Sequence, residues 1–242
     1  MKKLFTMIAL VVMCSILFTA CEERGENKDN KISGTNNGHE YVDLGLSVKW
    51  ATCNIGANSP EEDGDYFAWG EVTPKEIYDW DTYKYCNVEY RYVEYPASGG
   101  VYGYEYVPIV TKYTKGDGKT ILDLKDDAAR VNWGGAWRMP SPNEMQELID
   151  NCIWTWVEKD GIAGYKITSL VADHTDCSIF LPVTDKGEDG EYWLNSLSFY
   201  NYGNQTGSLN YAWYMWFDSD DMGWLGDGRS RCSGLTIRPV CE

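Results

Sequence analysis

Histidine and the short motifs of common catalytic sites are scarce in this chain. Only two of its 242 residues are histidine, His39 and His174, so a nucleophile activated by histidine has almost no candidates. The sequence contains no Gly-x-Ser-x-Gly, no His-Glu-x-x-His, no phosphate-binding loop and no Gly-x-Gly-x-x-Gly after a strand. No two cysteines form a Cys-x-x-Cys pair, and the histidines are not spaced as metal ligands. We therefore expect no catalytic residues, no metal and no cofactor.

Positive charge is also in short supply. Twenty-one Lys and Arg residues face 37 Asp and Glu residues, which gives a formal net charge of −16. Such a chain repels nucleic acid and anionic lipid, so we expect neither as a partner. The one long apolar run, residues 4–18, is shorter than the ~20 residues that span a bilayer. It follows Lys2 and Lys3, which is typical of an export signal.

The end of that run predicts a lipid anchor. Phe18-Thr19-Ala20-Cys21 resembles the lipobox cut by lipoprotein signal peptidase, with Phe in place of the usual Leu. The alternative is an ordinary secretory signal with a chance cysteine. We expect a signal peptide over 1–20, a flexible polar tether over 21–38 lipidated at Cys21, and one domain over 39–242. Acidic residues directly after Cys21 resemble an outer-face export signal, which points to the outer membrane or surface of a Gram-negative bacterium.

The domain has the pattern of an α+β fold. Short β-type runs dominate it, at residues 41–44, 48–52, 66–69, 165–168, 178–181, 191–195, 212–217 and 235–240. Ser141, Pro142 and Glu144 form the start signal of a helix, and apolar residues at i, i+3, i+4 and i+7 from Met145 reach Cys152. A shorter helix is expected over 126–131, before Gly134-Gly135. Residues 75–118 are rich in Tyr and Gly, and we expect a long excursion with some hairpin character.

Four segments carry a resemblance to a known family. They are YVDLGLSVKWATCN from Tyr41, YFAWGE from Tyr66, WGGAWRMPS from Trp133 and GLTIRPVC from Gly234. Together they resemble the Fibrobacter major paralogous domain family, and the last two are similar to the formylglycine-generating-enzyme branch of the C-type-lectin fold. The resemblance implies a small twisted, mostly antiparallel sheet with two helices and long irregular loops, and it brings the terminal strands together. Arg138 and Arg238, inside apolar strings, are then expected to pair with interior carboxylates or carbonyls.

Six cysteines remain after the signal peptide and Cys21, and an oxidising compartment permits disulfides among them. Sequence alone does not choose among fifteen connectivities. If the terminal strands are neighbours, as the resemblance implies, Cys53 and Cys241 come within disulfide reach. Cys232 and Cys241 do not reproduce the reactive cysteine pair of the formylglycine-generating enzymes.

Aromatic residues concentrate between Tyr192 and Trp224. Eleven of these 33 residues are aromatic, against 14% of the whole chain, and most of the others are Asn, Ser, Gly and Asp. Rigid amphipathic rings with adaptable polar neighbours are typical of recognition surfaces. On a strand over 212–217, alternation places Tyr214 and Trp216 on one face, which we expect to be exposed. The predicted ligand-binding residues are Tyr200, Tyr202, Tyr214, Trp216, Asp218, Asp220 and Trp224.

The sequence therefore favours a surface adhesin or recognition module for glycan or protein, touching the membrane through its lipid alone. The segment from Asp218 to Gly223 resembles a calcium loop but lacks the closing bidentate glutamate, so a solvated acidic turn is expected. Two alternatives stay open. One is an enzyme acting on carbohydrate or protein thiols, since 37 acids always permit a carboxylate pair. The other is a structural subunit of a surface assembly.

Overall fold

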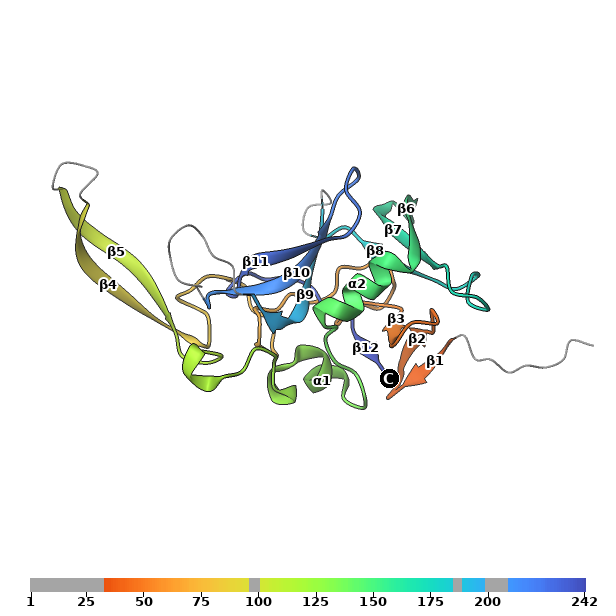
Figure 1. Cartoon of the computed structure of the whole chain (residues 1–242), viewed down its shortest axis with the longest axis horizontal. Coiled ribbons are helices and arrows are strands. Elements are labelled where there is room, and N and C mark those ends of the chain that lie inside the picture. Colours follow the sequence, from red (N-terminus) through yellow and green to blue (C-terminus); the bar gives the residue numbers. More distant parts are fainter. Residues whose placement is uncertain (1–32, 96–100, 185–188, 199–208) are drawn as a thin grey trace, which may run out of the picture. The chain divides into compact units, whose positions relative to one another are not determined.

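The computed structural model describes residues 33–95, 101–184, 189–198 and 209–242. Within them the chain forms mostly antiparallel strands and two α-helices, the α+β arrangement expected (Figure 1). The strands are β1 Ser33–Asn36, β2 His39–Val42, β3 Lys49–Ala51, β4 Cys86–Tyr95, β5 Val101–Val110, β6 Cys152–Lys159, β7 Ile162–Ser169, β8 Ser178–Pro182, β9 Gly190–Leu197, β10 Tyr211–Phe217, β11 Trp224–Ser230 and β12 Val240–Cys241. The helices are α1 Ala128–Trp133 and α2 Pro142–Asp150, with 3-10 turns η2 Lys115–Asp117 and η3 Leu124–Asp126. No helix among the described residues is long and apolar enough to cross a membrane.

The strands form four sheets, with orders β1-β2-β3-β12, β11-β10-β9, β6-β7-β8 and β4-β5. In the first, β3 pairs with β12, so segments from opposite ends of the domain lie side by side (Figure 1). The expected strand at 66–69 is reduced to an isolated bridge between Phe67 and Leu235, and only Val240 of the expected strand at 235–240 belongs to a strand, β12. The backbone of Ile55 also bonds to Ile237 there. The terminal segments are therefore held together, as expected.

The expected tether boundary is wrong at its C-terminal end. Residues 33–36 form β1, which pairs antiparallel with β2 through a two-residue turn at Asn37-Gly38. Both turn residues have positive φ, 48° and 86°, which is the backbone that Asn-Gly adopts in the turns that suit the twist of a hairpin. The polarity of this segment suggested a linker, but hydrogen bonding to β2 orders it. The domain therefore begins at or before Ser33.

Both predicted helices are present. Ser141 caps α2 by accepting a hydrogen bond from the Glu144 backbone, and the Glu144 side chain accepts one from the Ser141 backbone. Met145 and Leu148 on its apolar stripe are buried. The stripe is shorter than expected, however, because α2 ends at Asp150 and Cys152 is the first residue of β6. Cys152 is buried all the same, as part of the core.

The core consists of two large apolar clusters and a small one. One large cluster unites α2, β6–β8 and the inner faces of β9 and β10, and the other surrounds Trp69, Trp137 and Trp193. Two arginines inside apolar strings pair with interior groups, as expected, although Nη2 of Arg238 has no hydrogen-bond partner among the described residues. Arg138 pairs with Glu144 through two hydrogen bonds of 2.8 and 2.5 Å. Arg238 is fully buried and donates to Asn54 and to the carbonyls of residues 51 and 52.

Candidate functional site

The largest display of exposed aromatic side chains in the described residues lies on the β4–β5 hairpin. The two ten-residue strands pair in register along their whole length. Tyr90 lies opposite Tyr106, Tyr92 opposite Tyr104, and Tyr102 lies two residues from Tyr104. Residues directly opposite each other, and residues two apart, point to the same side of a sheet. These five tyrosines therefore share one face, which we name the tyrosine face.

The rings of the tyrosine face remain largely in solvent. Their exposure runs from 38% at Tyr106 to 72% at Tyr104. They touch one another across the strands, with centroids 5.6 Å apart for Tyr90–Tyr106 and 5.2 Å apart for Tyr92–Tyr104. The planes in these two pairs are inclined by 78° and 62°, whereas the rings of Tyr92 and Tyr102 stack nearly parallel, at 11° and 5.6 Å. The mutual contacts orient the rings without covering them.

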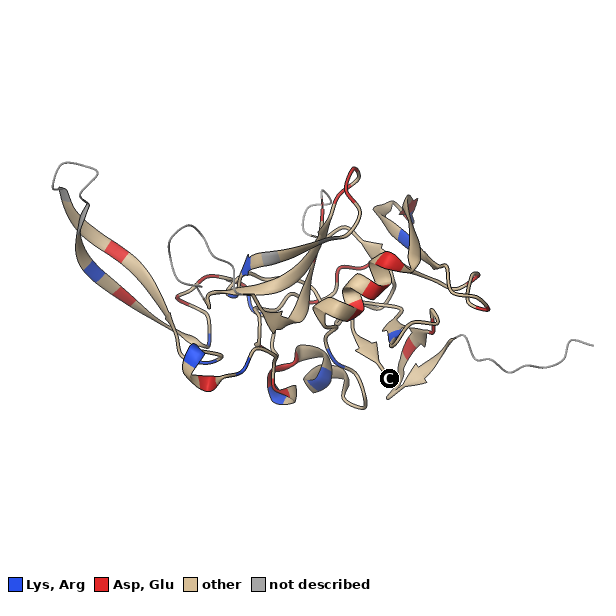
Figure 2. Ribbon diagram, in the orientation of Figure 1, with Lys and Arg blue, Asp and Glu red and all other residues tan. Residues whose placement is uncertain are grey.

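Most charged residues of the hairpin lie away from the tyrosine face, but each end of that face has one acidic residue. Asp81 hydrogen-bonds to the Tyr106 side chain, and Glu94 lies opposite Tyr102 in the register. Glu89, Arg91 and Glu105 lie at the alternate register positions and so on the opposite side of the hairpin. Arg91 donates two hydrogen bonds to Glu89 there, 3.2 and 3.1 Å long. Figure 2 shows these few charged residues on the hairpin. The tyrosine face thus offers ring faces and phenol hydroxyls to a ligand.

A buried carboxylate, Asp126, holds both ends of the hairpin. It accepts hydrogen bonds of 2.7 Å from the Tyr85 hydroxyl, just before β4, and 2.6 Å from the Tyr113 hydroxyl, after β5. Lys112 forms an ion pair with the same carboxylate. Burial acts to raise the pKa of Asp126, but the bonds from Lys112, Tyr113 and Tyr85 outweigh it and leave that pKa below its usual value. Burial raises the pKa of both phenols, which stay protonated donors.

A second buried group, Arg231, lies beside this anchor. Its guanidinium packs over the rings of Trp69, Tyr83 and Tyr113, at 4.9 to 5.9 Å from their centroids. It donates to the Tyr83 hydroxyl at 3.0 Å and to the Lys112 carbonyl at 3.0 Å. A cation enclosed by rings and hydrogen-bonded to neutral oxygens is a structural support. The hairpin therefore projects from a rigid base.

The aromatic residues predicted to bind ligand from β10 are engaged in packing. Tyr214 and Trp216 are only half-buried, but both rings have partners. Trp216 donates a 3.0 Å hydrogen bond from Nε1 to Asp189, and Arg229 lies 6.0 Å from the centre of the Tyr214 ring. The register between β10 and its neighbours shifts between Ala212 and Tyr214. Because of this bulge the alternation fails at Ala212, which is buried, although Tyr214 and Trp216 are still less buried than the residue between them.

The remaining predicted ligand-binding residues form no binding surface with Tyr214 and Trp216 in the described part of the chain. Asp218 accepts hydrogen bonds from the backbone of Asp220 and of residue 221, both 2.8 Å long, which makes a local acidic turn. Tyr200 and Tyr202 lie outside the described residues, as does the side chain of Trp224 at the start of β11. No group of three or more potential metal ligands occurs in the described part of the chain.

The predicted Cys53–Cys241 disulfide is not present, and all six cysteines of the described residues are free. The expectation that their strands are neighbours is right, but the register is wrong for a bridge. Cys241 lies opposite Lys49, and Cys53 lies four residues farther along the chain. β3 ends at Ala51, and Cys53 lies in the bend that follows it, away from the position opposite Cys241. Cys21 lies outside the described residues.

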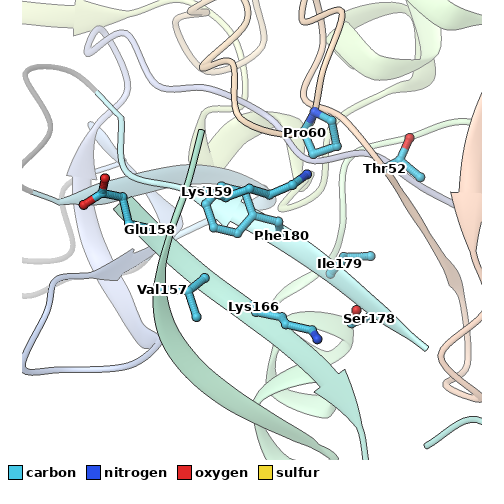
Figure 3. A pocket seen from close by; sticks show the side chains of 9 residues that line it. All are labelled: Thr52, Pro60, Val157, Glu158, Lys159, Lys166, Ser178, Ile179 and Phe180. Carbon is cyan, nitrogen blue, oxygen red and sulfur yellow. The ribbon is translucent and has the colours of Figure 1, made fainter. Parts of the chain in front are cut away.

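A cavity of about 410 Å³ occupies the outer face of β6–β8. Val157, Phe180 and two lysines line it, together with Pro60 from the loop after β3. Lys159 reaches toward Pro60 while Glu158 points away (Figure 3). Glu61 pairs with Lys159 and neutralises one of the two ammonium groups. The cavity is open and carries one uncompensated lysine, which is a weaker case for a site than the tyrosine face.

Sequence reasoning missed the tyrosine face, although a signal for it was present. Tyrosines alternate with other residues at 90 and 92, and again at 102, 104 and 106, on either side of the sequence PASGG at 96–100. Strict alternation in two segments separated by a short stretch with Pro and Gly is typical of a hairpin with one distinct face.

No family model matches this chain, and no curated protein or solved structure was found to be similar to it.

Proposed function

We propose that this protein is a lipid-anchored surface protein that binds a neutral glycan along the tyrosine face of the β4–β5 hairpin. The observation that carries the proposal is the row of five exposed tyrosines on one face of one hairpin. Sugar rings bind through stacking on aromatic faces and hydrogen bonds to hydroxyls, and tyrosine supplies both groups at low cost in side-chain entropy.

The size of the face favours a chain-like ligand over a folded protein. Ten residues at ~3.3 Å each make the hairpin about 33 Å long, and two strands ~4.8 Å apart make it narrow. With side chains about 10 Å across, one whole side of the hairpin covers on the order of 300 Å², and the five tyrosines take up about half of it. Stable protein interfaces bury about 800 Å² on each partner. A second copy of this chain is disfavoured further, since each copy carries a formal net charge of −16.

Charge and ring geometry narrow the class of glycan. An acidic polysaccharide is repelled by the strongly acidic chain, whereas a neutral one is not. The rings that face each other across the strands are inclined by 62° and 78°, and Tyr92 and Tyr102 stack on each other, so the rings do not form one flat platform for a crystalline polysaccharide surface. A soluble neutral oligosaccharide, whose sugar units can turn to follow successive rings, fits these features best.

The proposal is tested by a glycan array probed with the full chain and with the double variant Tyr92→Ala/Tyr104→Ala. We expect binding to neutral glycans to weaken at least about 30-fold, which corresponds to ~2 kcal/mol. The matched control is Glu89→Ala/Glu105→Ala, which changes the opposite side of the same hairpin and should leave binding unchanged. Equal binding by the tyrosine variant and the wild type, or capture of proteins but no glycans, would overturn the proposal.

The lipid anchor is a separate part of the proposal, carried by the sequence at Cys21. Lipidation at this residue would tether a domain that begins about a dozen residues later. Metabolic labelling of the expressing bacterium with an alkyne fatty acid should mark the wild type and not Cys21→Ala. Labelling of both, or of neither in a processed protein, would reject the anchor and leave the glycan site untouched.

For the fold, we propose the C-type-lectin-like class. The adjacent strands β3 and β12, the two helices and the short antiparallel sheets support it. In this arrangement the β4–β5 hairpin is an insertion between the N-terminal sheet and α1. An experimental structure in which β3 and β12 are not neighbours would reject the class.

A further inference from the structure

Two of the free cysteines, Cys86 and Cys232, lie at the base of the tyrosine hairpin. Cys86 is the first residue of β4, and Cys232 follows shortly after the end of β11. Both belong to one small apolar cluster, whose buried members are Ala68, Tyr83, Tyr85 and Cys232 and against which Cys86 packs. They are 146 positions apart in sequence, and tertiary folding alone brings them into this cluster.

One side-chain and one backbone hydrogen bond connect the two segments. Arg231, the neighbour of Cys232, donates from its guanidinium to the Lys112 carbonyl. Thr111, beside Lys112, donates from its backbone to the carbonyl of Tyr85, the residue before Cys86. These two bonds connect Arg231 to Tyr85 through Lys112 and Thr111. Cys232 directly follows Arg231 in the sequence, and Cys86 directly follows Tyr85.

The other cysteines lack such a neighbour. Cys152 lies opposite Ser169 on one side of β7, and Cys177 bonds to the same serine on the other side. With a strand between them, their Cα atoms are about 9.6 Å apart, too far for a bridge. Cys53 and Cys241 are separated by their register, as described above.

We propose that Cys86 and Cys232 form a disulfide that fastens the base of the tyrosine hairpin to the C-terminal segment. The inference does not depend on what the tyrosine face binds. Export to an oxidising compartment, predicted from the N-terminus, provides the setting in which the bridge persists.

The chemistry is an exchange with the disulfide of a dithiol–disulfide oxidoreductase. Cys86, the more exposed thiol, loses its proton and attacks the oxidant's disulfide, which forms a mixed disulfide and releases one oxidant thiolate. Cys232 loses its proton and attacks the Cys86 sulfur, which forms the bridge and releases the second thiolate. The two protons from the cysteines protonate the two released thiolates. The protein loses two electrons and the oxidant gains two.

The environment of the thiols makes this reaction pH-dependent. Burial raises the pKa of both thiols, and negative charge on Cys232 raises that of Cys86 further. Only the thiolate attacks, so the oxidation rate should rise about tenfold per pH unit from pH 7 to 8.

The test is a non-reducing peptide map of the purified full chain after incubation with oxidised and reduced glutathione at low protein concentration. Remaining thiols are blocked with N-ethylmaleimide before digestion with trypsin. Cleavage after Lys84 and Arg91 gives residues 85–91, and cleavage after Arg231 gives residues 232–242, because the Arg238–Pro239 bond resists trypsin. We expect these two peptides to be joined and to be lighter by two hydrogen atoms than their sum.

Two variants decide which thiol in the second peptide is used, since it contains both Cys232 and Cys241. The link should persist in Cys241→Ser and disappear in Cys232→Ser, with both variants folded by circular dichroism. Recovery of Cys86 and Cys232 as maleimide adducts from the oxidised wild type would overturn the proposal. So would a bridge from Cys86 to Cys241, or a bridge that forms only between molecules.

Discussion

Two regions of this molecule are rich in aromatic residues, and they use them in opposite ways. The tyrosines of β4–β5 remain 38 to 72% exposed, whereas Phe217, Tyr192 and Trp193 of the β9–β10 pair are buried to within 1%. The difference lies in the neighbours. β10 is the central strand of its sheet and has the core against one face, but β4 and β5 pair only with each other among the described strands. Aromatic content alone therefore does not locate a binding surface.

The buried and the exposed aromatic rings should contribute to different properties, stability and ligand binding. Rings in β10 bury large apolar areas and should govern the free energy of unfolding. Rings on the tyrosine face bury little and should govern affinity for a ligand. A two-stranded hairpin is marginal on its own, so its persistence here depends on the anchor that Asp126 provides.

The largest expected effect is on the buried side of this comparison. Phe217 is fully buried and packs against the rings of Trp154, Trp156, Tyr165 and Tyr192. Phe217→Ala should lower the free energy of unfolding by about 3–5 kcal/mol, since it leaves a cavity among rings that cannot collapse. Urea denaturation monitored by tryptophan fluorescence measures the loss.

The matched change on the exposed side is Tyr104→Ala, at a ring that is 72% exposed. Tyr104→Ala should lower the free energy of unfolding by no more than about 0.5 kcal/mol, because the Tyr104 side chain buries little surface. If the two variants proved equally destabilised, the hairpin rings would be part of a core that the structure does not show, and the comparison would fail.

The next effect concerns the anchor. Asp126→Asn keeps the size of the side chain but removes the charge that binds Lys112 and the phenols of Tyr85 and Tyr113. We expect a loss of about 2 kcal/mol, the scale of hydrogen bonds to a buried charged group. Hydrogen exchange of β4 and β5 amides should speed up more than that of β10 amides. Uniform acceleration would mean that Asp126 supports the whole domain rather than the hairpin.

The same anchor predicts a pH dependence. The folded-state pKa of Asp126 lies below its usual value, so its stabilisation is fully present above the unfolded-state pKa of ~3.9. It is lost as the pH falls through the lower, folded-state pKa. The difference in unfolding free energy between wild type and Asp126→Asn should therefore be constant near neutral pH and shrink below about pH 4. Urea titrations at a series of acidic pH values would show a widening gap if the sign is wrong.

Local signals in the sequence predict the elements that are stabilised by residues close together in the chain. Helix α2 begins where Ser141, Pro142 and Glu144 place it, because its cap is complete within four residues. The neighbouring terminal strands, β3 and β12, were expected from the family resemblance and not from a local signal. The pairing register that separates Cys53 from Cys241 is set by contacts distant in sequence, and no local pattern contains it.

The exposed face predicted for residues 212–217 is present only in part, because Tyr214 and Trp216 are half-buried but Ala212 is buried. Alternation in 212–217 predicts faces only for a regular strand, and the bulge between Ala212 and Tyr214 breaks it. The exposure of a side chain depends on which other elements cover its strand, and amino-acid composition does not predict these neighbours. The alternating tyrosines of 90–92 and 102–106 indicated a common face, but their exposure follows from the absence of a third strand beside β4 and β5 in the described residues.

A smaller effect sharpens the role of β10. Trp216→Phe keeps an aromatic ring but removes the indole donor that bonds to Asp189 at 3.0 Å. The cost should be about 1 kcal/mol, the net worth of one hydrogen bond. Glycan binding should not change if Trp216 serves packing alone. If Trp216→Phe had normal stability but no longer bound glycan, the binding site would have to include β10.

The smallest effect tests the two sides of the hairpin against each other. Arg91 and Glu89 form an ion pair on the side away from the tyrosine face, and both side chains are 55% exposed. Arg91→Ala should cost less than about 0.5 kcal/mol, because exposed ion pairs gain little in water. Its glycan affinity should equal that of wild type, whereas a tyrosine replaced one position away, at Tyr90 or Tyr92, should weaken binding. Isothermal titration with a glycan that the array identifies measures both. An equal loss for Arg91→Ala would mean that the ligand encloses the hairpin from both sides, since neighbouring residues of a strand reach opposite surfaces.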